Sequence, residues 1–204
     1  MVTAVNSMNR SSPPNLSVSH PMTTFVSLLR GINVAGHRPV PMAALRAAYA
    51  ALKFTRVRSH LQSGNVVFDA PTSDEAEMVG AIQDRIADDF GHEVRIVLRD
   101  ASAFTKSIAQ NPLAGIPGID VTHFHATLLE RQIPPAVFNA LTLPIRGGER
   151  AALVGDVVYL HCPHGYGDTK LNNGFFERKL GVTATTRNWR TLLALDRLAR
   201  DPSR

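Results

Sequence analysis

The feature that most constrains the fold of this 204-residue chain is an order of predicted strands and helices that occurs twice. Apolar runs and helically spaced apolar residues predict the order β-α-β-β-α-β-α from residue 22 to residue 112. The same order returns from residue 119 to the C-terminus, although the residues of the two halves hardly match. The stretch between them, NPLAGIPG, contains prolines and glycines, which interrupt regular structure. We therefore predict two subdomains, residues 22–112 and 119–204.

This element order is that of ferredoxin-like domains, which are built from a split β-α-β arrangement. The predicted fold class is α+β: a duplicated ferredoxin-like protein with antiparallel sheets and helices packed on one face. Residues 1–21 are rich in Ser, Pro and Asn, show no periodicity and lack the apolar stretch of a signal peptide. We predict that they form a disordered N-terminal tail, with Met22 as an alternative start of translation.

Several local signals predict where individual elements begin and end. Thr72 and Glu75 have the spacing of a capping box at the start of the second helix, and Gly91 is placed to end that helix. Asp100 is placed to cap the next helix. Gly155-Asp156 lies between two apolar runs and predicts a two-residue hairpin turn.

Composition limits the classes of function. The single cysteine, Cys162, excludes an internal disulfide and fits a reducing compartment, which favours a cytoplasmic location. No apolar run approaches the length needed to cross a bilayer, so no membrane association is predicted. The formal charge is +5, and basic residues concentrate between residues 169 and 204. A basic face favours anionic partners and steers them at low salt.

The first predicted site follows the opening strand of the first half. Arg30 leads from this strand into a glycine-bounded loop that also carries Asn33, His37 and Arg38. A strand, a loop and a helix N-terminus in this order can present backbone N–H groups to an anion. The hairpin between the second and third strands carries Gln62, Ser63 and Asn65. Because the first and third strands are neighbours in ferredoxin-like sheets, we expect both polar groups at one end of the sheet.

The second predicted site lies in the second half, where the glycine-rich loop HGYGDTK ends at Lys170. The last strand runs into Arg187 and Asn188, and we expect Lys170 and Arg187 to lie close together. Two cations held close together usually need an anion between them. The Walker spacing of a P-loop is absent, so nucleotide hydrolysis by that mechanism is not predicted. If the halves pack with these ends facing, both groups form one cleft for a phosphate-bearing metabolite, a nucleotide or a nucleic acid.

At these residues the chain resembles a known family. The segments SLLRGINVAGH, LQSGNVVF, GYGDTKL, ERKLG and TTRNW are similar to the signature segments of the bacterial family called domain of unknown function 1697 (DUF1697). The resemblance runs from Met22 almost to the C-terminus. It implies a two-part α+β fold with ferredoxin-like halves in a bacterial cytoplasmic protein. The family has no established biochemistry, so no catalytic residue or cofactor follows from it.

Plainer roles compete with ligand binding at several of these residues. Arg30 could instead pair with a carboxylate, and Asn33 could satisfy the backbone of its own loop. Ser63 and Asn65 suit a turn, whereas the turn gives less reason for Gln62. Both interpretations therefore stay open at this end of the sheet.

Histidine and cysteine patterns leave an enzyme as the second interpretation. His125 begins an H-x-T-x pattern like that of two-histidine phosphoesterases, but the sequence lacks a second copy of the motif. An enzyme of phosphoryl or acyl chemistry would use His37 or His125. His161, Cys162 and His164 lack the second ligand pair of a structural zinc site, so no metal is predicted. A protein-interaction module without a small ligand is the third interpretation.

Overall fold

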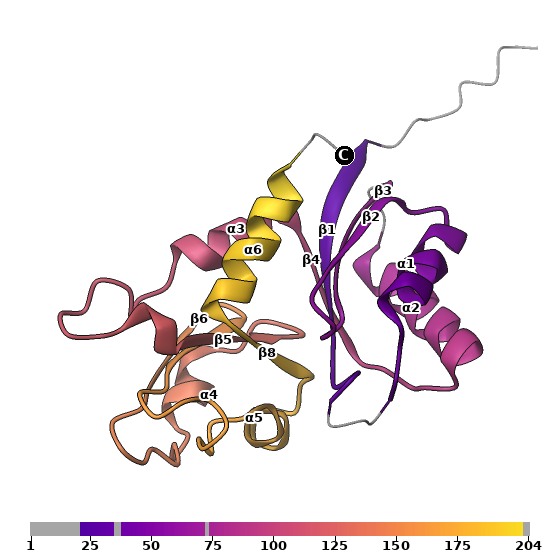
Figure 1. Cartoon of the computed structure of the whole chain (residues 1–204). Helices are drawn as coiled ribbons and strands as arrows, with labels where there is room; N and C mark the ends of the chain where they lie inside the picture. Colours follow the sequence, from indigo (N-terminus) through magenta and orange to yellow (C-terminus); the bar gives the residue numbers. More distant parts are fainter. Residues whose placement is uncertain (1–20, 35–37, 72–73, 202–204) are drawn as a thin grey trace, which may run out of the picture.

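The computed structural model describes residues 21–34, 38–71 and 74–201. Within these residues the chain forms two four-stranded antiparallel sheets, six α-helices and one 3-10 helix (Figure 1). The α+β class is therefore confirmed. No helix in the described ranges combines the length and the hydropathy that a membrane span requires. Residues 1–20 of the predicted tail lie outside the described residues, as does His37.

The first half of the chain forms the first sheet. Its elements are β1 (Met22–Leu29), α1 (Met42–Ala51), β2 (Thr55–His60), β3 (Asn65–Pro71), α2 (Glu75–Phe90) and β4 (Ile96–Asp100), followed by α3 (Ala101–Ala109). The strands lie in the order β2-β3-β1-β4. β1 is therefore central, with Phe25 opposite Phe68 on β3 and Val26 opposite Arg99 on β4.

The second half forms the second sheet with the same internal order. Its elements are η1 (Val121–His123), β5 (Phe124–Leu129), α4 (Pro135–Asn139), β6 (Arg150–Val154), β7 (Val157–His161), α5 (Asn173–Leu180), β8 (Ala184–Asn188) and α6 (Trp189–Arg200). The strands lie in the order β6-β7-β5-β8, so β5 takes the place that β1 has in the first sheet. Ala126 on β5 lies opposite Arg187 on β8.

Several predicted ends of elements are confirmed. Gly91 ends α2 in the left-handed conformation, with φ at 67°. The Asp100 side chain caps α3 by accepting a hydrogen bond from the backbone N–H of Ala103. Gly155-Asp156 forms the turn between β6 and β7. Thr72 of the predicted capping box lies outside the described residues, and Asp74 caps α2 at the backbone N–H of Ala76.

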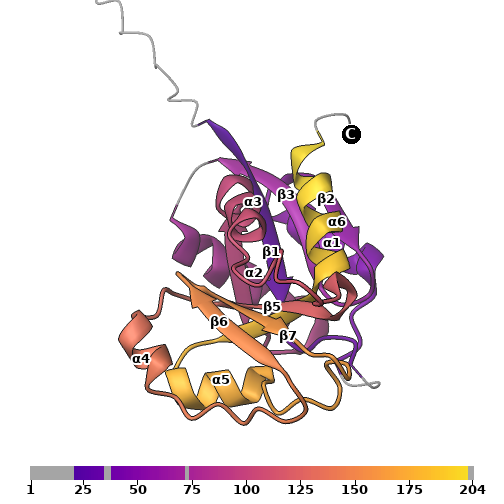
Figure 2. The same ribbon diagram turned by 90° about the vertical axis from the view of Figure 1, so that its left-hand side faces the viewer.

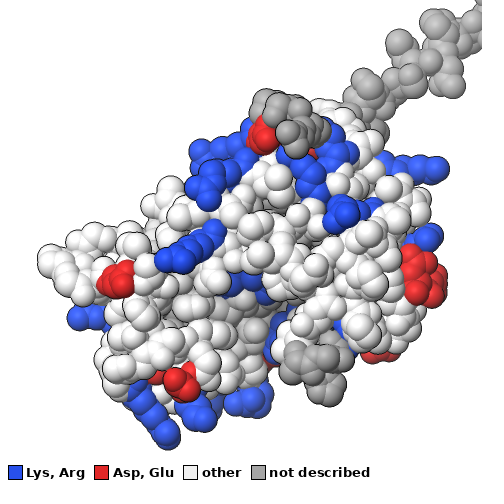
Figure 3. Space-filling view, viewed as in Figure 1, with Lys and Arg blue, Asp and Glu red and all other residues white. Residues whose placement is uncertain are grey.

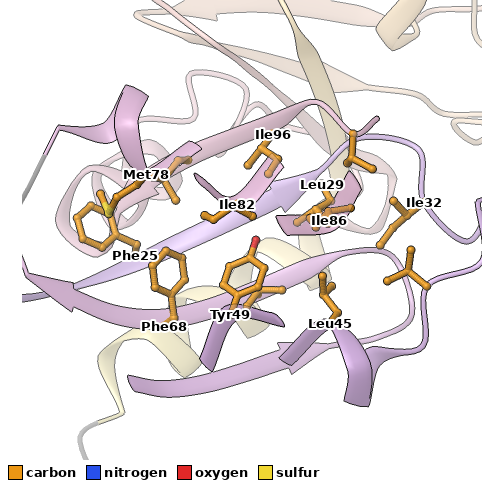
Figure 4. Packing of buried hydrophobic residues seen from close by; sticks show 14 of the residues in the cluster. Phe25, Leu29, Ile32, Leu45, Tyr49, Phe68, Met78, Ile82, Ile86 and Ile96 are labelled. Atoms are coloured by element: carbon orange, nitrogen blue, oxygen red, sulfur yellow. The ribbon is translucent and has the colours of Figure 1, made fainter. Parts of the chain in front are cut away.

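The outer face of each sheet packs against two of the three α-helices of its own half. On the first sheet, the side chains of Phe25, Leu29 and Phe68 contact those of α1 and α2, including Tyr49 (Figure 4). The Tyr49 ring meets Phe68 edge-on at 5.2 Å, and its hydroxyl hydrogen-bonds Ser27 at 2.8 Å. Burial of this phenol raises its pKa far above the usual range. The second sheet packs against α4 and α5 in the same way.

The inner faces of the two sheets share one apolar cluster with α3 and α6. It joins Val26 and Leu28 of the first sheet to Ala126 and Leu128 of the second, with Phe104 of α3 and helix α6 beside them. In Figures 1 and 2, α3 and α6 lie side by side on the inner face of the first sheet, next to the second sheet. The expectation of helices on one face is therefore wrong for α3 and α6. Both helices carry apolar residues that are buried only between the sheets.

Candidate functional site

Arg187 joins the two halves of the molecule. From β8, its Nε donates to Asn65 Oδ1 at 2.5 Å, and its Nη2 donates to the carbonyls of Leu29 (2.9 Å) and Ser63 (3.0 Å). Its Nη1 donates to the Thr185 hydroxyl and the Thr186 carbonyl. These five bonds use every N–H of the guanidinium group. Arg187 therefore links the two halves of the molecule and has no N–H group left without an acceptor.

The surroundings of Arg187 bear on the predicted anion site. Burial, reinforced by the positive charge of Arg30, lowers the pKa of Arg187 to about 10. Lys170 is exposed to solvent, whereas protein acceptors occupy every N–H of Arg187. An anion held between these two cations stays a prediction, and it would have to displace an acceptor from Arg187.

Arg30 also connects the halves. It leaves the end of β1 and places Nε and Nη2 at 3.3 Å from the two carboxylate oxygens of Glu177 on α5. Glu177 also accepts the backbone N–H of Ala184. The carboxylate-pairing alternative for Arg30 is therefore confirmed. The Arg30 side chain is 31% exposed, so solvent partly screens this ion pair.

The polar residues of the first predicted site do come together, but they bind one another. Asn33 donates to the carbonyls of Val40 (2.9 Å) and Gln62 (2.7 Å) and accepts the Val40 N–H, so it satisfies its own loop. Asn65 is fully buried and donates to the His60 carbonyl and the Ser63 hydroxyl. Ligand contact by these residues stays a prediction, and the exposed Gln62 side chain is the group left available for it.

The turn that holds Asn65 requires glycine at the preceding position. Gly64 has φ at +70°, and a Cβ there would lie 2.7 Å from the Cβ of Leu29. Its carbonyl accepts the Leu29 N–H at 2.8 Å. The close approach brings the Ser63 and Leu29 carbonyls within reach of one guanidinium group.

Arg99 connects the halves in the opposite direction, from the first sheet to the second, and it was not among the residues singled out from the sequence. It lies on β4 at the position that Arg187 has on β8, because their partners Val26 and Ala126 occupy equivalent places on β1 and β5. Its Nη2 donates to the Leu129 carbonyl and lies 2.7 Å from Asp156 in the β6–β7 turn. A helix-capping residue directly follows each arginine, Asp100 after Arg99 and Asn188 after Arg187. An arginine followed directly by a helix-capping Asp or Asn therefore occurs once in each half, and this repeated pattern is the sequence signal that could have identified Arg99.

Asn188 therefore has a structural role at the predicted site. Its side chain accepts the backbone N–H of Thr191 at 2.8 Å and caps α6. Of the second predicted group, only Lys170 is both exposed to solvent and without a hydrogen bond or ion pair to any described residue. The predicted meeting of the two groups occurs at the contact between Arg187 and Asn65, where protein atoms fill the space.

An open cavity of about 660 Å³ lies beside the Arg30–Glu177 pair. Its lining has equal numbers of basic and acidic side chains, with few apolar groups: Arg30, Arg38, Arg95, Asp84, Glu93, Glu177, Gln83, Ala87 and Val94. Arg38 and Arg95 form no ion pair with any described carboxylate. No aromatic side chain lines the cavity among the described residues, which exclude residues 35–37 beside Arg38. We call this opening the junction cavity, because Arg30 and Glu177 come from different halves.

Comparisons with known proteins agree with this architecture. Residues 22–159 match the model of the family described as protein of unknown function (DUF1697). The chain belongs to this family. Among solved structures, it is similar to the conserved bacterial protein SP0830 from Streptococcus pneumoniae, with a TM-score of 0.68 and 21% identity over 88% of this chain and 100% of that one. That similarity shows a shared fold. Comparison with curated proteins gave no significant match.

Three histidines of this DUF1697 protein, His123, His125 and His161, lie in the second half and do not line the junction cavity. His125 stacks on Tyr166 with ring centroids 4.9 Å apart, and its Nδ1 lies 3.2 Å from the His123 carbonyl. Burial lowers the pKa of His125, so the ring is neutral near pH 7. Tyr166 donates to the Thr186 hydroxyl at 3.0 Å. Within the described residues, no carboxylate orients His125, and no group of three or more metal-ligating side chains gathers.

Proposed function

We propose that this DUF1697 protein binds a small, highly polar ligand with a phosphate or carboxylate group in the junction cavity. The observation that supports this most is the pair Arg38 and Arg95, whose guanidinium groups line the cavity without a described carboxylate partner. Charge-assisted hydrogen bonds from such groups to an anion are stronger than neutral ones, and arginine can make them in pairs. Arg30, whose side chain is partly exposed, lines the same cavity.

The rest of the lining narrows the ligand further. Asp84 and Glu93 lie in the same cavity and favour a ligand that also carries an amino group. These carboxylates would repel a ligand that carries only negative charge. Among the described residues, Ala87 and Val94 are the only apolar members of the lining. The described lining also offers no aromatic side chain for stacking on a nucleobase, which favours an amino-phosphate or amino-carboxylate metabolite over a nucleotide.

The proposal also covers the fold of each half and the kind of organism and compartment in which the protein occurs. We take the two halves as ferredoxin-like subdomains, residues 22–112 and 119–204, that arose by duplication in a bacterial cytoplasmic protein. The shared strand order and the equivalent arginines, Arg99 and Arg187, support the duplication. The junction cavity would then be a property of the pair of halves rather than of either half alone.

Thermal unfolding against a panel of amino-phosphates, amino-carboxylates and simple phosphates tests the proposal. A ligand at 100 times its dissociation constant adds about 2.7 kcal/mol to the free energy of unfolding. We expect that gain with one class of compound, and its loss in Arg38→Ala and Arg95→Ala. Arg85→Ala is the matched control, because Arg85 pairs with Asp89 on α2 and does not line the cavity. Stabilisation that survives both cavity variants, or a panel with no active compound, would refute the proposal.

A further inference from the structure

The charges of this protein are segregated between two sides of the first sheet. Helix α2 and its flanks, residues 74–93, carry Asp74, Glu75, Glu77, Asp84, Asp88, Asp89 and Glu93 against one arginine, Arg85. Helix α2 packs on the outer face of the sheet. Helix α6 packs on the inner face and exposes Arg190, Arg197 and Arg200. Figure 3 shows Lys and Arg side chains gathered around the end of α6 near the C-terminus.

Strand β2 extends this positive charge along the open edge of the sheet. β2 is one of the two edge strands of this sheet, and the Nη1 atoms of Arg56 and Arg58 both donate to the Asp201 carbonyl just beyond α6, at 3.3 and 3.2 Å. Arg46 reaches the same strand from α1 and donates to the Ser59 hydroxyl at 2.8 Å. Lys53 is exposed just before the strand. We call this set the basic edge: Arg46, Lys53, Arg56, Arg58, Arg197 and Arg200.

Much of the charge of the basic edge is available to a partner. Arg56 pairs with Asp69 and Arg200 pairs with Asp196. Within the described residues, Arg46, Lys53 and Arg197 form no ion pair. Asp69, Asp196 and Asp201 are the carboxylates that these contacts place beside the six basic residues.

Protection of an edge strand against pairing with other chains explains only part of this set. Arginines on β2 itself, Arg56 and Arg58, serve that purpose well. Arg46 on α1 and Arg197 on α6 lie on neighbouring helices and do not block the edge. Arg46 contacts β2 through Ser59, and the Asp201 contacts place the end of α6 beside β2, so strand and helices add positive charge to one region that a polyanion could contact.

We infer that the basic edge binds the phosphate backbone of a nucleic acid. The large hydrophobic side chains exposed among the described residues are all aliphatic: Met22, Val34, Leu61, Val121, Val137 and Ile145. Base stacking on exposed aromatic rings is therefore not the mode of contact, and recognition is independent of sequence. The acidic α2 repels a polyanion from the outer layer and orients it towards β2 and α6. None of these six residues lines the junction cavity, so this inference does not rest on ligand binding there.

Fluorescence anisotropy with the full-length protein and a labelled single-stranded oligonucleotide of about 20 nucleotides tests the inference. Contact with about four phosphates gives a slope of roughly −3 in a plot of log K against log salt concentration. We expect the double variant Lys53→Glu/Arg197→Glu to weaken binding by at least about tenfold and to flatten this slope. The control is Arg178→Glu/Lys179→Glu, which makes the same charge change at exposed positions of α5.

The control separates a local surface from a general effect of net charge. If the inference is correct, the α5 double variant binds almost as tightly as the natural sequence and keeps its salt slope. Equal losses in both double variants would overturn it, as would an absence of binding at low salt. Binding to vesicles of anionic lipid without binding to the oligonucleotide would also overturn it, in favour of a membrane surface.

Discussion

At the residue scale, one position explains why the two connecting arginines differ. Asn65 lies opposite Leu28 in the first sheet, and Val157 lies opposite Leu128 in the second, so the two residues are equivalent. Asn65 accepts the Nε–H of Arg187. Valine has no acceptor, and the Nε of Arg99 is buried without a hydrogen-bond partner. All N–H groups of Arg187 are therefore hydrogen-bonded, whereas the Nε–H of Arg99 is not.

Replacement of Asn65 by valine should leave Arg187 with an unpaired Nε–H like that of Arg99. Asn65→Val leaves the buried Nε–H of Arg187 unpaired, so we expect the free energy of unfolding to fall by about 1–3 kcal/mol. Chemical denaturation measures this change. Ser63→Ala is the control, because it keeps the Ser63 carbonyl that Arg187 uses and removes one hydroxyl acceptor of Asn65. Equal stability of Asn65→Val and the natural sequence would contradict the role given to this bond.

At the element scale, the helices that follow β4 and β8 are attached in the same way with different chemistry. Asp100 caps α3 and Asn188 caps α6, each directly after a connecting arginine. Burial raises the pKa of Asp100, but hydrogen bonds from Ala103 and Ser102 outweigh it and hold the pKa below its usual value. The asparagine cap has no charge to titrate. The two helix starts should therefore respond differently to acid.

The capping carboxylate should make α3 sensitive to acid. Because its folded pKa is lowered, Asp100 stabilises the protein fully above its unfolded pKa of about 3.9, and this contribution is lost as the pH falls through the lower folded value. Asp100→Asn should remove that pH-dependent contribution and retain most of the cap. Unfolding measured between neutral pH and about pH 3 checks this, with Asn188→Asp as the reverse change. An unchanged pH profile in Asp100→Asn would show that Asp100 has no such role.

Elements could be predicted from the sequence because their signals are local. Apolar spacing, Gly91, Asp100 and the Gly155-Asp156 turn predicted the order of strands and helices and several of their ends. The contacts between halves could not be predicted in this way. Arg30 and Glu177 are 147 residues apart, and no local pattern marks them as partners. The polar residues near the ends of β1 and β8 could be picked out from the sequence, but their hydrogen bonds to one another depend on how the two halves pack.

At the scale of the whole molecule, the two halves share a core and two reciprocal arginine contacts. Arg187 binds the carbonyl at the end of β1, and Arg99 binds the carbonyl at the end of β5. The inner faces of both sheets are buried only against each other and against α3 and α6. Separation of the halves would expose Val26, Leu28 and Val97 on one side and Tyr159 on the other.

The halves should therefore unfold together. We expect differential scanning calorimetry of the full chain to give one transition whose calorimetric and van't Hoff enthalpies agree. Residues 22–112 produced alone should lack a cooperative transition, because their inner face then meets water. Two resolved transitions in the full chain would instead show that each half folds independently.

The most direct measurement for the proposed function is a titration followed through the arginine Nε–Hε signals in the NMR spectrum. Phosphoethanolamine is a suitable probe because it carries both a phosphate and an amino group. Our account predicts that the signals of Arg38 and Arg95 move with added probe, while Arg187, whose five donors are already bonded, stays fixed. Movement at Arg187 or at the backbone of Lys170, with Arg38 and Arg95 unchanged, would contradict the placement of the site in the junction cavity.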